Sequence, residues 1–98
     1  MTMGALALTG NAGKRGGAGT GSVGLTGTTH LPYANAFGED IDTLDQIEMM
    51  LDNPSSGVDA PAAFIFEPIQ GEGGLNAASA KWMKGIADLA KKHGALLI

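Results

Sequence analysis

Apolar residues predict a strand, a helix and a second strand over residues 62–98. The segment Ala62–Glu67 is an apolar run that ends at Pro68, which is typical of a buried strand. A helix is predicted from the cap Ser79 to His93, and its apolar face holds Trp82, Ile86 and Leu89. Gly94 would end the helix, and Ala95–Ile98 predicts the second strand. Such a βαβ unit requires parallel pairing of its strands.

Both predicted strands are apolar on both faces. Residues 64–66 and 96–98 contain no polar side chain. Parallel sheets are covered by helices on both sides, whereas the predicted helix of this unit can cover only one side. We therefore expect the chain to be an internal piece of a larger α/β protein.

Three further elements are expected nearer the N-terminus. Residues 1–9 are rich in Ala, Leu and Met and predict a helix without an N-cap. Thr28–Leu31 predicts a short strand closed by a proline. Helical spacing predicts a helix over Ile41–Leu51, with Asp42 as its cap, and a loop over Ser55–Pro61 follows.

The segment Gly10–Gly27 is expected to be a loop, because it contains eight of the sixteen glycines. Its residues 19–24, Gly-Thr-Gly-Ser-Val-Gly, match the dinucleotide-binding pattern G-x-G-x-x-G. That pattern requires a strand before it and a helix after it, and neither is predicted here. A chance match is therefore favoured over a nucleotide site.

Composition limits the functional classes. A chain of 98 residues suits at most one small domain, and a net charge of -4 with only six basic residues argues against a nucleic-acid partner. The chain has no cysteine, and His30 and His93 stand alone, so no metal site is expected. No apolar run approaches a membrane span and no basic n-region precedes one, so we expect a cytoplasmic protein without a membrane partner.

The polar loop after the first strand of the βαβ unit is the candidate site. Ligands of open α/β sheets bind beyond the carboxyl ends of the strands. In this loop Glu67 and Glu72 supply carboxylates and Gln70 supplies an amide. The glycines around them are Gly71, Gly73 and Gly74. Solvated carboxylates are the simpler alternative, and a glycoside hydrolase pair is disfavoured because nothing fixes the separation of the two carboxylates.

The second predicted helix carries four lysines away from its apolar face. We expect these side chains to lie in solvent rather than to bind a cofactor covalently: Lys81, Lys84, Lys91 and Lys92. Trp82 and Met83 are expected in the core instead.

The segment Glu67–Gly74 resembles a segment of the class III pyridoxal-phosphate-dependent aminotransferases. Its sequence, Glu-Pro-Ile-Gln-Gly-Glu-Gly-Gly, follows the family's Glu-Pro-x-Gln-Gly-Glu-Gly-Gly. The rest is similar to one subgroup, the diaminobutyrate–2-oxoglutarate aminotransferases, over the segments Thr2–Asn11, Leu31–Tyr33, Thr43–Asp45, Ser55–Asp59 and Asn76–Ala80. The likeness weakens over Lys14–Gly27, and Glu67-Pro68-Ile69 is closer to the general family pattern than to the subgroup.

The resemblance implies part of the large domain of a fold-type I enzyme, with three α/β/α layers, in a parent that is a homodimer or a higher homo-oligomer. It also implies pyridoxal 5'-phosphate bound to a lysine, with an aspartate at the pyridine nitrogen. Neither anchor is expected in this chain, which would lack catalytic residues of its own. Glu67 resembles the glutamate beside the cofactor, with Gln70 near it. Glu72 resembles the glutamate that pairs with a substrate-binding arginine and swings aside for a dicarboxylate.

The implied reaction moves an amino group between L-glutamate/2-oxoglutarate and diaminobutyrate/aspartate semialdehyde, both of them small molecules. Ornithine, acetylornithine or 4-aminobutyrate aminotransferases are alternatives in the same family. A different class also stays open, a small non-catalytic module that binds a partner through its acidic middle. Nine of the ten acidic residues lie between Glu39 and Glu72, with no basic residue among them.

Overall fold

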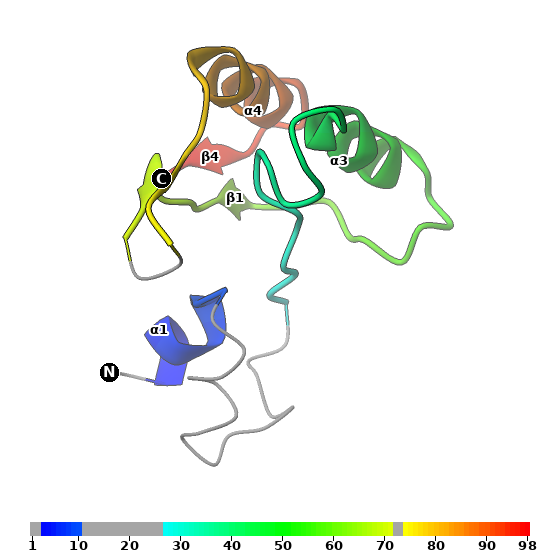
Figure 1. Cartoon of the computed structure of the whole chain (residues 1–98). Helices are drawn as coiled ribbons and strands as arrows, with labels where there is room; N and C mark the ends of the chain where they lie inside the picture. The colour runs from blue at the N-terminus through cyan, green and yellow to red at the C-terminus, as the bar shows by residue number, and fades with distance from the viewer. Residues whose placement is uncertain (1–2, 11–26, 72–73) are drawn as a thin grey trace. The chain divides into compact units, whose positions relative to one another are not determined.

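The computed structural model describes residues 3–10, 27–71 and 74–98 of the chain (Figure 1). The chain divides into two compact units, Met1–His30 and Leu31–Ile98, and each is described by itself. Within the described ranges, no helix has the length and apolar character that crossing a membrane requires.

The first unit contains one short helix, α1 (Met3–Leu8). The predicted N-terminal helix is thus confirmed in its described part, and Ala7 is buried. His30 Nε2 lies 3.1 Å from the carbonyl oxygen of Ala7. The predicted strand over Thr28–Leu31 is wrong, because these residues form no regular element or ladder. The predicted loop Gly10–Gly27, with the glycine pattern inside it, lies outside the described residues except at its ends.

Helix α3 (Thr43–Asp52) confirms the predicted helix and its cap Asp42, although it begins at Thr43 rather than at Ile41. The Asp42 carboxylate accepts a hydrogen bond from the Leu44 amide at 2.9 Å, which satisfies one of the unpaired donors at the helix start. Asn53 ends the helix. Thr43 and Ile47 are fully buried at 0% and 1% exposure, so one face of α3 belongs to the core.

Helix α4 (Ala80–Lys92) also confirms its prediction. The Ser79 hydroxyl accepts a hydrogen bond from the Trp82 amide at 3.1 Å. Gly94 has a φ of +66°, a conformation that glycine adopts without the steric cost of a Cβ, and it terminates the helix. The buried face of α4 consists of Trp82, Ile86, Leu89 and Ala90.

Strands β1 (Ala63–Phe64) and β4 (Leu96–Leu97) pair in parallel, with Ala63 opposite Leu96. The ladder continues on both sides, through Leu96 N to Ala62 O at 2.9 Å and Phe66 N to Ile98 O at 3.3 Å. The predicted strands are therefore longer than the regular elements, but their pairing and the α/β fold class are confirmed.

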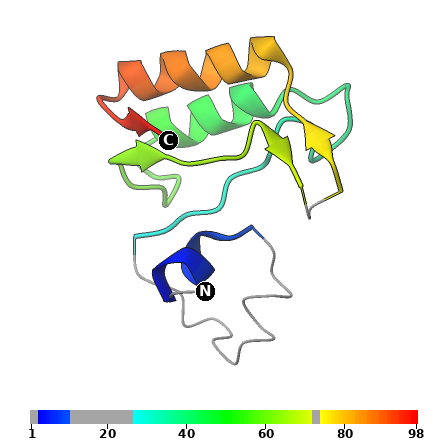
Figure 2. The same cartoon turned by 90° about the vertical axis from the view of Figure 1, so that its left-hand side faces the viewer.

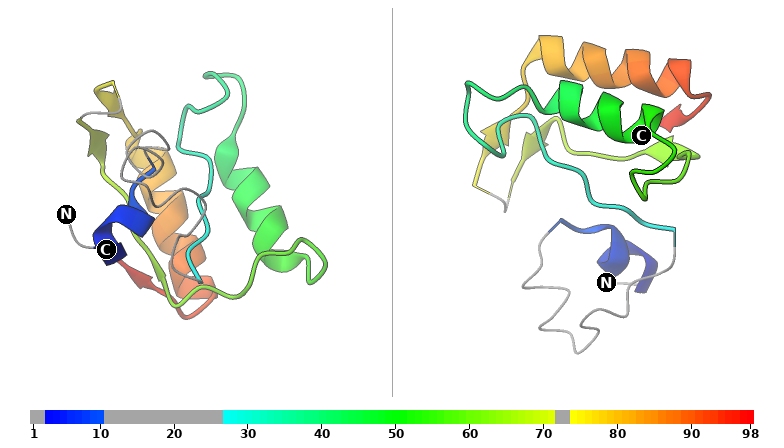
Figure 3. Two further views of the ribbon diagram at one scale, coloured as in Figure 1. Left: turned by 90° about the horizontal axis from the view of Figure 1, so that it is seen from below. Right: turned by 90° about the vertical axis from the view of Figure 1, so that its right-hand side faces the viewer.

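Helices α3 and α4 run side by side, and α4 lies over the β1–β4 pair (Figures 2 and 3). Phe64 points into this layer and is buried. On the opposite face of the pair, Ile65, Leu96 and Ile98 are 53%, 69% and 64% exposed. Within the unit Leu31–Ile98, the described helices thus cover one side of the parallel strands, as the sequence predicts.

Beyond β1 the chain forms an antiparallel hairpin that the sequence did not predict. Strand β2 (Ile69–Gln70) pairs with β3 (Asn76–Ala77), and Gln70 lies opposite Asn76. This hairpin, with Glu67 and Pro68 before it, is called the hairpin segment, residues 67–78.

Candidate functional site

The hairpin segment begins at the carboxyl end of β1. Residues 65–68 connect β1 to β2, and the Pro68 carbonyl accepts a hydrogen bond from the Ala78 amide at 3.0 Å. This bond closes the base of the hairpin, so that the chain leaves β1, turns and returns to the start of α4. The polar candidate residues therefore follow a parallel strand, which is where ligands of α/β sheets bind.

Two described residues in the turn of the hairpin have positive φ angles. Gly74 has a φ of +112°, and Leu75 has a φ of +57° although it carries a side chain. The Leu75 amide donates to the Gly71 carbonyl at 3.3 Å. A β-carbon is disfavoured at such angles, so Gly74 is a conformational requirement of this turn.

The hydroxyl of Tyr33 contacts the main chain at the base of the hairpin segment. Its hydroxyl lies 2.7 Å from the carbonyl oxygen of Glu67, 3.0 Å from that of Pro68 and 3.5 Å from that of Asn76. A phenol has one proton to donate, and the shortest distance favours Glu67 as its acceptor. Sequence reasoning gave Tyr33 no role; its only signal was the resemblance over Leu31–Tyr33.

The surroundings of Tyr33 keep its hydroxyl protonated. Burial raises the pKa of Tyr33 above its usual value of 10.0, and the negative charge of Glu67 raises this pKa further. A hydrogen bond with the Ala78 backbone acts in the opposite direction, but the net direction is upward. The hydroxyl is therefore a donor at neutral pH.

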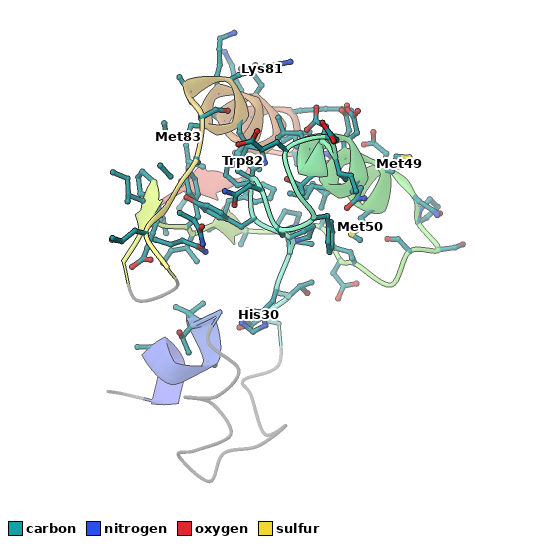
Figure 4. All side chains as sticks on the ribbon, in the orientation of Figure 1. His30, Met49, Met50, Lys81, Trp82 and Met83 are labelled. Atoms are coloured by element: carbon teal, nitrogen blue, oxygen red, sulfur yellow. The ribbon has the colours of Figure 1, made fainter. Side chains whose placement is uncertain are left out.

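The Tyr33 ring is anchored in the core by Trp82. The two ring centroids lie 5.3 Å apart at an interplanar angle of 49°, and Phe66 approaches Trp82 edge-on at 5.6 Å. Trp82 Nε1 donates to the Thr43 hydroxyl at 2.8 Å. Figure 4 shows Trp82 on the inner side of α4, whereas Lys81 points away from the core. The support of the hairpin segment thus extends to both helices.

The predicted site residues differ in their exposure, and two of them lie outside the described residues. Glu67 is exposed, and Gln70 is half-buried with its amide oxygen accepting from Asn76 Nδ2 at 3.2 Å. Gly71 and Gly74 lie in the turn of the same segment. The other two predicted site residues, Glu72 and Gly73, lie outside the described residues.

The family pattern described as aminotransferase class-III matches residues 1–98, the whole chain. The chain belongs to the class-III aminotransferases. Its resemblance to this family, first noted in the Glu67–Gly74 segment, is thereby confirmed.

Curated relatives agree with the family assignment. A diaminobutyrate–2-oxoglutarate transaminase of Bordetella parapertussis is 50% identical over 95 residues, which are 97% of this chain and 21% of that protein. The transaminase of the same name from Halalkalibacterium halodurans is 47% identical over 98 residues, 100% of this chain and 22% of that protein. An uncharacterized aminotransferase of Sinorhizobium fredii is 45% identical over the same length, covering 21% of that protein. The chain thus spans about a fifth of the length of these relatives.

Class-III aminotransferases generally depend on pyridoxal phosphate, and the hairpin segment fits a place beside such a group. Glu67 and Gln70 offer a carboxylate and an amide, which can orient or polarise a nitrogen heterocycle. An acidic, acceptor-rich segment does not suit the phosphate group, which prefers cationic side chains or helix N-termini. The fit is that of a neighbour of the cofactor rather than of its anchor.

The lysines of α4 lie in solvent, as the sequence predicted. Lys84 pairs with Asp88 at 3.8 Å, and Lys92 contacts Glu48 and Asp52 on α3 at 3.3 and 3.1 Å. All four α4 lysines are exposed. In the part of the chain that the structure describes, no three His, Cys, Asp or Glu side chains are grouped to hold a metal ion.

Proposed function

We propose that this chain is part of the cofactor-binding large domain of an aminotransferase that moves an amino group between L-glutamate/2-oxoglutarate and diaminobutyrate/aspartate semialdehyde. The observation that carries the proposal is the family match over the whole chain, together with relatives of that named activity at 47–50% identity. The hairpin segment supports it, because its polar residues follow the carboxyl end of a parallel strand.

Pyridoxal phosphate, when bound, supplies the electron sink that this reaction needs. In our proposal Glu67 and Gln70 lie beside it, where a carboxylate tunes the electronic state of a heterocycle and an amide orients it. The lysine that binds the cofactor lies elsewhere in the whole protein. This assignment agrees with the exposed side chains of the α4 lysines.

The proposed role of Glu72 rests on the sequence pattern alone. A carboxylate next to glycines can approach a cationic partner closely, because the backbone there is free to adopt positive φ. Paired with a substrate-binding arginine, Glu72 neutralises that arginine while the diamine is bound. It gives way when glutamate or 2-oxoglutarate brings a carboxylate of its own.

Two charge-removing variants of the whole enzyme test these roles. Glu72→Gln should change the ratio of the two half-reaction rates by about tenfold in favour of the dicarboxylate, because a charge-assisted pair is lost. Glu67→Gln should instead shift the absorption spectrum of the bound cofactor. Single-turnover rates and spectra measure both effects, and Glu39→Gln in an exposed loop is the matched control. Equal slowing of both half-reactions by Glu72→Gln, with a shifted spectrum, would mean that the two roles are reversed.

The choice of amine is tested with the same enzyme. We expect diaminobutyrate to give a higher kcat/KM than ornithine, acetylornithine or 4-aminobutyrate. A preference for any of these three would move the proposal to that alternative within the family.

The isolated 98-residue chain is expected to have no transaminase activity. It should also form no covalent bond to pyridoxal phosphate that borohydride traps on a single lysine, because every α4 lysine is exposed to solvent. Mass spectrometry after borohydride treatment is the measurement. Stoichiometric labelling of one lysine would overturn this part of the proposal.

A further inference from the structure

The junction between β1 and the hairpin carries Glu67, one of the candidate site residues. Glu67 and Pro68 belong to neither strand. Pro68 has no amide proton, so it cannot donate a backbone hydrogen bond that would fix the junction. The Pro68 carbonyl is held by the Ala78 amide at 3.0 Å, and the Glu67 carbonyl is met by the Tyr33 hydroxyl at 2.7 Å.

Tyr33 is suited to fix this junction because its own position is fixed. Its ring packs against Trp82, which is only 7% exposed, and Trp82 is tied to α3 by the 2.8 Å hydrogen bond to Thr43. The hydroxyl therefore extends from the helical core to the main chain of Glu67, which lies 34 positions away in sequence.

We propose that Tyr33 is a positioning residue for Glu67, whose hydroxyl fixes the main chain of the junction and thereby the place from which the Glu67 carboxylate extends. The effect on the cofactor rests on the proposed function of Glu67. The positioning itself rests on the contacts of Tyr33. The position of a side chain depends on the position of the backbone that carries it. A displacement of about 1 Å in an active site can lower the rate about a hundredfold.

The test is Tyr33→Phe in the full-length holoenzyme, because it removes the hydroxyl and keeps the ring against Trp82. Ser56→Ala is the matched control, since the Ser56 hydroxyl also donates to a main-chain carbonyl, that of Met50 at the end of α3. Hydrogen exchange of the amides in residues 69–78 should become about tenfold faster in Tyr33→Phe. The amides of α4 should keep their protection, and Ser56→Ala should leave the hairpin segment unchanged.

The functional arm compares Tyr33→Phe with Glu67→Gln and with the double variant. We expect Tyr33→Phe to shift the cofactor spectrum in the same direction as Glu67→Gln and to lower kcat about tenfold. The double variant should be no slower than Glu67→Gln, because a residue that acts through Glu67 has nothing left to position.

Three results separate the possible failures. Unchanged exchange in residues 69–78 would overturn the positioning by Tyr33. If the rate losses of the two single variants multiply in the double variant, Tyr33 does not act through Glu67. Faster exchange in Tyr33→Phe, combined with a Glu67→Gln enzyme of normal spectrum and rates, would support the positioning and overturn the proposed function of Glu67.

Discussion

The helical layer and the hairpin segment are built on different principles. Helices α3 and α4 contain ten and thirteen residues, both with side-chain caps, and bury Ile47 and Ile86 to 1% and 2% exposure. Strands β2 and β3 contain two residues each, and the apolar side chains of Ile69 and Leu75 are 63% and 77% exposed. Buried apolar side chains hold the two helices together, whereas individual hydrogen bonds hold the hairpin in place.

Because of this difference, the helical layer provides the stability of the fold, whereas the hairpin segment carries the candidate site. A packed layer resists deformation, since each side chain there contacts many others. The hairpin segment presents polar groups that a packed core could not expose to a ligand. The side-chain hydrogen bonds that support it, from Tyr33 and Asn76, can each be removed by one substitution. Variants should therefore divide into those that unfold the protein and those that displace the candidate site.

The largest expected effect is loss of stability from a cavity in the helical layer. Leu89→Ala should lower the free energy of unfolding by about 2 to 5 kcal/mol, because Leu89 is 6% exposed within the α4 core face. Urea denaturation measures this effect. Ile69→Ala in the hairpin is the control and should change stability by less than about 0.5 kcal/mol. Similar losses in the two variants would contradict the contrast between the regions.

A second effect of the helical layer comes from its buried polar pair. Thr43→Val should cost about 1 to 3 kcal/mol, because it leaves the Trp82 indole N–H buried without its acceptor. Removing both partners, in Thr43→Val with Trp82→Phe, should cost less than the sum of the single variants. A double-mutant cycle measured by denaturation gives this coupling, and strict additivity would show that the hydrogen bond does not stabilise the fold.

Local sequence signals predicted the helical layer well. Asp42 and Ser79 cap helices, Gly94 ends one, and the apolar spacing marked the buried faces. These signals lie within a few residues of what they determine. The helical cover of one side of the parallel strands within Leu31–Ile98 was also predictable, because the helix of a βαβ unit lies on one side of its strands.

The hairpin segment was predicted only as a polar loop. Two-residue strands have no periodicity from which to recognise them. In the turn between them, Gly74 and Leu75 have positive φ. The contact of Tyr33 with Glu67 could not be predicted either, since it joins residues far apart in sequence through a single hydroxyl. Sequence reasoning therefore named candidate residues for the site, but it did not predict the contacts of Tyr33 that support them.

A third effect concerns the contact between the two helices. A β-carbon on Gly85 of α4 would collide with Cδ1 of Leu44 on α3, and Cδ2 of the same side chain would be 3.0 Å away. Alanine is favoured over glycine in a helix by about 1 kcal/mol, so the collision opposes a gain in helix propensity. Gly85→Ala should thus be near neutral or destabilising in the natural sequence. In a Leu44→Ala background it should stabilise by about 1 kcal/mol.

Thermal and urea denaturation of the four proteins in this cycle measure the coupling between Gly85 and Leu44. The hairpin offers the comparison Gly71→Ala, where a β-carbon meets nothing within 4 Å. An equal effect of Gly85→Ala in both Leu44 backgrounds would mean that α3 and α4 are not in close contact at this point.

The smallest expected effect is electrostatic. It concerns the exposed ion pairs of Lys92, the last residue of α4. Lys92 of α4 contacts Asp52 and Glu48 of α3 at 3.1 and 3.3 Å, and its side chain is half exposed. Hydrogen bonds from Lys92, first to Asp52 and then to Glu48, raise the pKa of Lys92 above its usual value of 10.5. The folded state therefore holds this proton more tightly than the unfolded chain does.

The sign of the resulting pH dependence follows from that difference. The contribution of Lys92 is complete below the usual lysine pKa of 10.5 and is lost as pH rises through the higher pKa of the folded state. The contribution of Tyr33 to stability is also lost as pH rises, because the pKa of Tyr33 is raised in the folded state as well. Lys92→Met should flatten the alkaline decline of stability, while Tyr33→Phe should remove only the tyrosine part. Unfolding measured from neutral to alkaline pH, at low and high salt, tests this assignment. An alkaline decline that is unchanged in Lys92→Met at low salt would show that the ion pairs between α3 and α4 add nothing to the packing of the helices.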